Sequence, residues 1–163
     1  MYLPEIEQVV GIQLRLILNW QDGQLVELSL QWADGETSSS NLSAMGKKLE
    51  DCLIRYEEGE DVVWPPIEFA FEALTPFARK VLKLLMDVPY GTTISYGELA
   101  ARAGNPSAAR GVGNIMGRNR WGLIIPCHRV VGANGIGGYG GLGVSMKRYL
   151  LGIEGVLPKV TEK

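Results

Sequence analysis

Histidine, cysteine and long apolar runs are scarce in this chain. The 163 residues include one histidine and two cysteines, too few for a closed zinc site with four Cys or His ligands, so no metal is expected. The apolar runs are far shorter than the roughly 18 residues that a membrane-spanning helix needs. The first residues lack the basic and apolar segments of a secretory signal. We therefore expect a protein with free thiols that has no membrane partner and works in the reducing cytoplasm, or in the nucleus of a eukaryote.

Charge is distributed unevenly along the chain. Residues 1–74 carry four Lys or Arg against fourteen Asp or Glu, a net charge of −10, whereas residues 75–163 carry twelve against four, a net charge of +8. A basic half is typical of a protein that binds a polyanion, and phosphate would repel the acidic half. The alternative is that the charges segregate by chance, or that they help two domains to associate. The local sequence pattern changes at the same boundary, which predicts two domains, 1–74 and 75–163.

The acidic domain is predicted to be a small α+β unit. Residues 9–20 alternate loosely, with Ile12 and the leucines that follow it on one face of a strand. The pair Asp22-Gly23 is a hairpin signal. From Leu42 onward, apolar residues recur at helical spacing, and Cys52 on this helix is expected to be a packing residue.

The basic domain is predicted to be mainly helical. Thr75 and Pro76 are typical of a helix start, and two short helices follow, over 96–103 and from Ser107 to about 116, joined by a tight turn. This pair is a helix-turn-helix candidate. The expected fold class is α+β, with a small RNase H-like sheet-plus-helix domain followed by a mainly helical, winged-helix-like domain.

The four residues Pro126-Cys127-His128-Arg129 are the most informative in the chain, because its only histidine directly follows a cysteine. A thiol is nucleophilic only as its thiolate, and a neighbouring base favours that form. Since adjacent side chains point apart, a water or a third residue would have to relay the proton. These residues alone fit a buried structural cysteine beside a surface histidine equally well.

Several stretches together resemble the catalytic domain of the O6-alkylguanine-DNA alkyltransferases, also called methylated-DNA–protein-cysteine methyltransferases. They are Val88–Gly91, Ile94–Tyr96, Asn105–Gly113, Ile124–Val131, Gly135–Leu142, Lys147 and Leu150–Gly155. The resemblance implies repair by direct damage reversal, in which the alkyl group of O6-alkylguanine passes to the protein's own cysteine. The reaction would be a single turnover without a cofactor. Whether O4-methylthymine is also repaired stays open.

The resemblance also implies catalytic roles for individual residues. Cys127 would be the nucleophile, His128 would take its proton through a water, and Glu154 would orient the histidine. Tyr96 would donate to guanine N3 as negative charge develops on the leaving base. Asn119 would tie the second helix of the helix-turn-helix to the active-site loop.

Further residues would contact DNA or the damaged base. The base would be flipped out of the duplex, and Arg110 would fill the space that it leaves. The resemblance implies sequence-independent binding of double-stranded DNA in the minor groove by a monomer. The other expected DNA contacts are Arg102, Ser107, Ala108, Ala109, Gly113, Arg118 and Arg120. The expected substrate-binding residues are Met116, Val130, Tyr139 and Gly140.

Two departures from the family pattern leave the preferred alkyl group open. Arg120-Trp121 follows Asn119 where many relatives have proline, and could add a stacking surface to the pocket wall. Gly140 stands where some relatives carry serine.

Two other function classes compete with alkyl transfer. An alkyltransferase-like lesion sensor would bind the damaged base without reacting, but those relatives lack the cysteine that is present here as Cys127. A cysteine hydrolase could use Cys127, His128 and Glu154, but that function would not account for Arg110 or the basic half.

Overall fold

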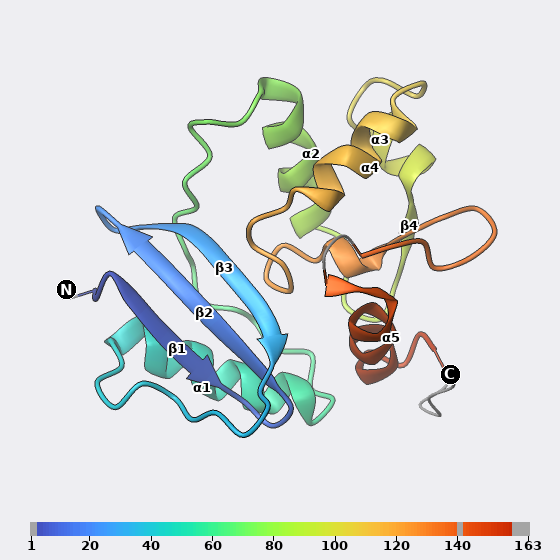
Figure 1. The fold of residues 1–163 in the computed structure, drawn as a ribbon. Coiled ribbons are helices and arrows are strands. Elements are labelled where there is room, and N and C mark those ends of the chain that lie inside the picture. Colours follow the sequence, from blue (N-terminus) through green and yellow to red (C-terminus); the bar gives the residue numbers. More distant parts are fainter. Residues whose placement is uncertain (1–2, 140–141, 158–163) are drawn as a thin grey trace. The chain divides into compact units, whose positions relative to one another are not determined.

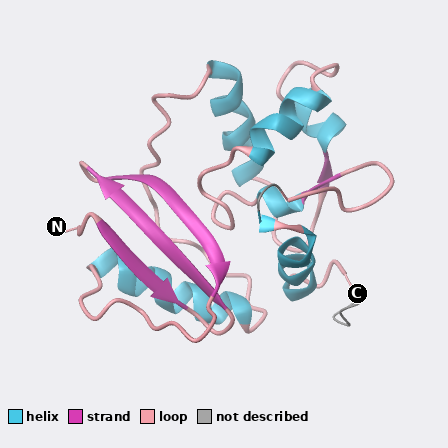
Figure 2. Ribbon diagram, in the orientation of Figure 1, coloured by secondary structure: helices cyan, strands magenta, loops and turns pink. Residues whose placement is uncertain are grey.

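The structure, a computed structural model, describes residues 3–139 and 142–157. It has an α+β fold, as predicted, and divides into two compact units, residues 1–70 and 71–163. Figure 1 and Figure 2 show the strands and helices of each unit. None of the helices in the described ranges is long and apolar enough to cross a membrane. Gly140 lies outside the described residues.

The first unit contains a three-stranded antiparallel sheet in the order β1 (Ile6–Val10), β2 (Leu14–Gln21) and β3 (Gln24–Trp32). Alternate residues of β2 are buried, as expected for a sheet with one face against a core. The predicted hairpin at Asp22-Gly23 is confirmed: both residues have positive φ, 51° and 80°, which suits a two-residue turn between β2 and β3.

The predicted strand over residues 9–20 is wrong at one place. β1 ends at Val10, and Ile12, which was expected on the apolar face, lies in a turn and is 52% exposed. The carboxylate of Glu57 accepts hydrogen bonds from the backbone N–H groups of residues 12, 13 and 14, at 2.6, 2.8 and 3.3 Å. A contact with a residue more than forty positions away therefore fixes this turn, and local alternation could not reveal it.

Helix α1 (Ala44–Glu57) packs against the sheet through β1 (Figure 1). Its N-cap, Ser43, accepts a hydrogen bond from Gly46 N, and Ser43 N and Oγ both donate to the buried carboxylate of Glu7. Trp20 Nε1 donates to the same carboxylate at 2.9 Å. These bonds satisfy a carboxylate that is only 1% exposed.

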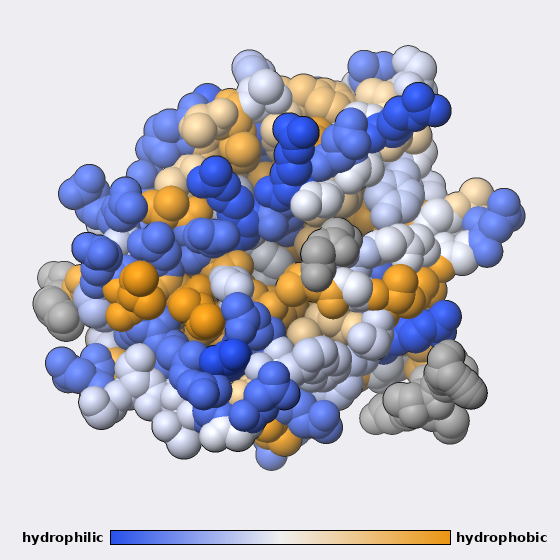
Figure 3. All heavy atoms as spheres, in the orientation of Figure 1, coloured by the Kyte–Doolittle hydropathy of each residue, from blue (hydrophilic) through white to orange (hydrophobic). Residues whose placement is uncertain are grey.

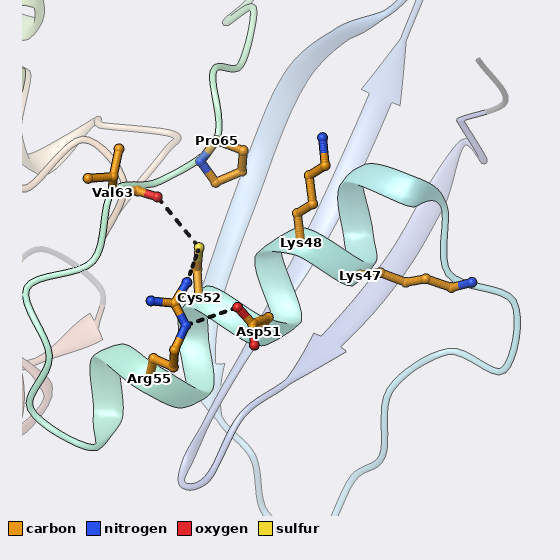
Figure 4. A pocket seen from close by; sticks show the side chains of 7 residues that line it. All are labelled: Lys47, Lys48, Asp51, Cys52, Arg55, Val63 and Pro65. Atoms are coloured by element: carbon orange, nitrogen blue, oxygen red, sulfur yellow. Dashed lines mark hydrogen bonds and ion pairs between the residues drawn. The ribbon is translucent and has the colours of Figure 1, made fainter.

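Cys52 is a buried residue of α1, as predicted for a packing cysteine (Figure 4). Its Sγ lies 3.6 Å from the carbonyl of Val63 and 3.7 Å from Arg55 Nη2. Burial raises the pKa of this thiol, against the lowering effect of the Arg55 charge, so the protonated form is favoured. The shallow pocket beside it is lined by Lys47, Lys48, Asp51, Cys52, Arg55, Val63 and Pro65.

The second unit is mainly helical. Its elements are α2 (Pro76–Met86), β4 (Ile94–Ser95), α3 (Tyr96–Arg102), α4 (Ala109–Gly117), a 3-10 turn (Cys127–Arg129), β5 (Val130–Val131) and α5 (Val144–Ile153). Thr75 caps α2 by accepting from Ala78 N, and Pro76 occupies the first turn, as predicted. The short parallel pair β4–β5 joins the start of α3 to the segment that follows the 3-10 turn.

Helices α3 and α4 form the predicted helix-turn-helix pair, but α4 starts later than expected. Its first residue is Ala109, and Ser107 lies in the preceding turn, where its Oγ donates to Asn105 Oδ1 at 3.0 Å. Such local side-chain bonds favour turns over helix. The N-cap position, Ala108, makes no side-chain capping bond, which leaves the first N–H groups of α4 without a side-chain acceptor there.

Some apolar side chains are exposed at the surface. Figure 3 shows hydrophilic side chains over much of the visible face, with apolar ones between them. Among the described residues the large exposed apolar side chains are Ile6, Ile12, Val63, Met86 and Val144.

Candidate active site

The segment that follows α4 positions Cys127 through one asparagine. Asn119 Nδ2 donates to the carbonyl of Ile125 at 3.0 Å, and Asn119 Oδ1 accepts from Trp121 N at 3.0 Å. Between these anchors Leu123 has φ 76°, which is unusual for a residue with a side chain. The end of α4 is thereby tied to the loop that carries the cysteine.

The thiol of Cys127 is almost fully enclosed, at 6% exposure. Burial raises the pKa of this thiol, and hydrogen bonding from Asn119 and Tyr139 and the charge of Lys147 partly oppose the rise. The resting group is therefore a thiol, so any reaction that uses its thiolate must also remove a proton. Side-chain donors around the sulfur would then stabilise the anion.

A base is available next in the chain. His128 is completely buried, and its Nε2–H donates to Glu154 Oε2 at 2.6 Å. Its Nδ1 has no hydrogen-bond partner among the described residues. Burial lowers the pKa of His128, against the raising effect of Glu154. The arrangement gives a neutral imidazole with one nitrogen oriented by a carboxylate and the other able to take a proton.

Glu154 follows α5 and is held in its ionised form. Burial alone would raise the pKa of this carboxyl. The hydrogen bond from His128, the charge of His128 once it is protonated in acid, and the hydrogen bonds and charge of Arg129 outweigh burial and lower the pKa to about 2. The Arg129 Nε donates to Oε1 at 2.9 Å, and Gly91 N donates to the same oxygen at 3.1 Å. The turn before β4 is thus joined to the same carboxylate.

Tyr96 begins α3 and keeps its phenolic proton. Burial and the charge of Cys127 both raise the pKa of Tyr96, so the hydroxyl remains a hydrogen-bond donor at neutral pH. Gly137, with φ 77°, lies against it: a Cβ there would be 3.0 Å from Tyr96 Oη. Only glycine suits both the backbone conformation and the space at this position.

Lys147 is a fully buried cation on α5. Its Nζ donates to the carbonyls of Val130, at 2.6 Å, and Gly138, at 3.0 Å. Burial lowers the pKa of Lys147 to about 8, against the raising effect of the Cys127 charge. This lysine therefore joins β5 to the loop that follows it, at Gly138, and places a positive charge near the sulfur of Cys127.

Comparison with known proteins identifies the family. The protein-family model described as "6-O-methylguanine DNA methyltransferase, DNA binding domain" matches residues 76–156. A probable methylated-DNA–protein-cysteine methyltransferase of Acanthamoeba polyphaga mimivirus is 34% identical over 154 residues, which cover 94% of this chain and 97% of that relative. The chain belongs to the methylated-DNA–protein-cysteine methyltransferase family. The resemblance predicted from the sequence is confirmed.

Other members of the methyltransferase family agree in sequence and fold. The protein of Salmonella typhimurium is 42% identical over 121 residues, 74% of this chain and 67% of the relative. The crystal structure of Mycobacterium tuberculosis OGT in complex with DNA has a TM-score of 0.76 at 33% identity, covering 92% of each chain. The O6-methylguanine-DNA methyltransferase of Pyrococcus kodakaraensis has a TM-score of 0.70 at 29% identity, covering 93% and 98%.

The residues expected to contact DNA lie on and around α3 and α4. Arg110 on α4 is exposed, and so are Arg118 and Arg120 after it. Arg102 at the end of α3 is exposed but forms an ion pair with Glu98 at 2.6 Å. Ser107 is exposed, and Ala108, Ala109, Gly113 and Met116 are half-buried.

Trp121 does not provide the stacking surface that its position suggested. It is 1% exposed, and its ring packs edge-to-face on Phe71, with centroids 5.1 Å apart. The residue is part of the core of the second unit because the loop after Asn119 turns inward there.

Sequence reasoning missed two charged residues of this site. The sequence places Arg129 in the motif around Cys127 and Lys147 at a position that matches the family pattern, but neither observation predicts a role for the side chain. Both side chains point inward, onto Glu154 and onto two backbone carbonyls, respectively. Lys147 is the fourth residue of a helix that also carries the buried Met146 and Leu150. A lysine among these apolar residues was the one available signal.

Proposed function

We propose that this protein repairs DNA by moving the alkyl group of O6-alkylguanine onto Cys127 in one irreversible turnover. The observation that carries the proposal is the pairing of an enclosed thiol with a buried His128–Glu154 dyad whose remaining imidazole nitrogen, Nδ1, can take a proton. The chain's membership of the methylated-DNA–protein-cysteine methyltransferase family supports the same chemistry.

The proposed reaction begins with the thiol proton. It passes from Cys127, through a water, to Nδ1 of His128, and the imidazolium is stabilised by the ionised Glu154. The thiolate then attacks the alkyl carbon: the S–C bond forms as the C–O6 bond breaks, and the electron pair stays on guanine. Tyr96 donates a hydrogen bond toward N3 as this negative charge develops. At that point His128 holds the proton that came from sulfur, and its positive charge balances the negative charge on the guanine.

The reaction ends in a thioether. A displacement at carbon needs only the thiolate, its base and a stabilised leaving group, so we propose no cofactor. The product sulfur is neutral and bonded to carbon, and no step in the proposed reaction regenerates the free thiol of Cys127. One protein molecule would therefore repair one lesion.

DNA binding is assigned to α3, α4 and the residues that follow them. Arg110 is exposed on α4, among small residues, where it could fill the space of a flipped nucleotide. Flipping costs a few kcal/mol, which phosphate contacts from neighbouring cations would offset. Candidate contacts are Arg102, Ser107, Ala108, Ala109, Gly113, Arg118 and Arg120. We propose binding as a monomer, in the minor groove and without sequence preference.

The damaged base would occupy the space around Tyr96 and the loop after β5. We propose that Met116, Val130 and Tyr139 line this pocket, as does Gly140 outside the described residues. The assignment of catalysis and DNA binding to residues 75–163 is part of the proposal. Residence in the cytoplasm, or in the nucleus if the host is a eukaryote, would give access to genomic DNA.

The test is incubation with duplex DNA that carries radiolabelled O6-methylguanine. We expect label to pass to the protein, to saturate near one methyl group per chain and to map to the peptide with Cys127. Cys127→Ala should abolish transfer, whereas Cys52→Ala, which removes the other cysteine, should retain it. Binding without label would indicate a lesion sensor, and label released to water over many turnovers would indicate a hydrolase.

A further inference from the structure

Arg129 is a charged residue whose whole guanidinium group faces the interior. Its Nε and Nη2 donate to Glu154 Oε1 and Oε2 at 2.9 and 3.1 Å, and its Nη1 donates to the carbonyl of Val88 at 2.7 Å. The guanidinium carbon lies 6.0 Å from the centroid of the Tyr90 ring. With 9% of the residue exposed, this cation is directed at the dyad and away from solvent.

The two oxygens of Glu154 are fully engaged by four donors. Oε1 accepts from Arg129 Nε and Gly91 N, while Oε2 accepts from His128 Nε2 and Arg129 Nη2. A two-point guanidinium contact fixes the plane of a carboxylate as well as its position. The histidine is therefore oriented by a group that cannot rotate without breaking three further bonds.

We propose that Arg129 is a positioning residue for proton transfer from Cys127: it holds Glu154 so that His128 keeps its Nε2–H bond and presents an unprotonated Nδ1. This inference rests on the proposed function, because it concerns the base of that reaction. Arg129 is assigned no contact with DNA or with the damaged base.

Charge explains why a cation beside Glu154 matters for His128. A buried imidazole with only the anionic Glu154 beside it would tend to be protonated already, and a protonated base cannot accept the thiol proton. Arg129 compensates the carboxylate, so the resting pair needs no imidazolium. Among the described residues, Lys147 and the adjacent Cys127 are further titratable groups near His128. Burial has the largest lowering effect on the pKa of His128, and the Arg129 and Lys147 charges lower it further.

The single histidine makes a direct test possible, because ¹⁵N-labelled histidine gives the signals of one imidazole. In the full-length protein we expect an Nε2–H tautomer and a pKa below the ordinary 6.5. Arg129→Met removes the charge and keeps the stem, and should move the His128 titration to higher pH by about one unit. Arg148→Met, which removes an exposed cation from α5, is the matched control and should leave the titration in place.

Transfer kinetics connect the titration to the reaction. With O6-benzylguanine as a free base, which needs no DNA contact, the acid limb of the transfer rate should move to higher pH in Arg129→Met by the same amount as the titration. Arg129→Lys keeps the charge but not the two-point contact, so its acid limb should stay within a few tenths of a pH unit of wild type while the plateau rate falls about tenfold.

The outcomes separate the two proposals. A wild-type protein that transfers no alkyl group to Cys127 would overturn the proposed function. A wild-type protein that transfers normally, with an Arg129→Met variant that shows the wild-type titration and pH profile, would overturn only the role of Arg129. If the Met variant does not fold, the Lys variant decides: a wild-type plateau rate overturns the positioning role, and a tenfold loss with an unmoved acid limb supports it.

Discussion

Acid should destabilise this protein through Glu154. The pKa of this buried carboxyl is lowered from the ordinary 4.5 to about 2, so the folded state binds the proton less well than the unfolded chain does. Its contribution to stability is present in full above pH 4.5 and is lost as the pH falls through 2. Each unit of pKa shift corresponds to about 1.4 kcal/mol, so the lowered pKa of Glu154 contributes about 3 kcal/mol to the free energy of unfolding. Of this, about 2 kcal/mol is lost between pH 6 and pH 3.

Urea unfolding followed by tryptophan fluorescence measures this loss. Wild type and Glu154→Gln are compared at pH 6, 4.5 and 3. Groups distant from Glu154 cancel in the difference, whereas the His128 titration changes when its partner is lost, so the His128 contribution is measured by ¹⁵N NMR in both proteins and subtracted. The excess stability of wild type should shrink by about 2 kcal/mol over this range. Parallel pH dependences would refute the reasoning. Should the variant be too unstable, carboxyl ¹³C NMR of wild type decides, since a Glu154 midpoint at 4.5 or above contradicts it.

Other substitutions test other parts of the site. Lys147→Met should raise the pKa of the Cys127 thiol and slow its reaction with iodoacetamide at pH 7, where Lys147 with its pKa of about 8 is mainly charged, because the substitution removes a nearby positive charge. Gly137→Ala should lower the free energy of unfolding by about 1–3 kcal/mol, measured in urea, since the new Cβ would meet Tyr96 Oη; an unchanged value would contradict the close approach. Tyr96→Phe should slow transfer without loss of fold. Arg110→Ala should weaken repair of duplex DNA far more than reaction with O6-benzylguanine, and equal losses would remove its role in base flipping.

Local signals in the sequence predicted local structure well. The hairpin at Asp22-Gly23, the cap at Thr75 and the two short helices depend on residues within a few positions of one another. The turn at residues 11–13 was missed because Glu57 forms it from far along the chain. Periodicity carries no information about such partners.

The candidate site shows the same division. Cys127 and His128 are neighbours in sequence, and the structure places His128 on Glu154, 26 positions away, as the family resemblance implied. No signal in the sequence indicated the inward direction of Arg129, and for Lys147 the only signal was its position beside buried helix residues, because an Arg or Lys is ordinarily a surface residue. Only the fold shows that their acceptors are a buried carboxylate and two carbonyls of β5 and the following loop.

The buried carboxylate of Glu7 has a consequence for how the first sheet assembles. Because side chains alternate between the two faces of a strand, sliding β1 by one residue would turn Glu7 and Val9 toward water and bring Gln8 and its alternate neighbours inward. The slipped pairing would strand the indole N–H of Trp20 and both Ser43 donors without their acceptor. The buried Glu7, together with the donors that surround it, therefore favours one alignment of the strands.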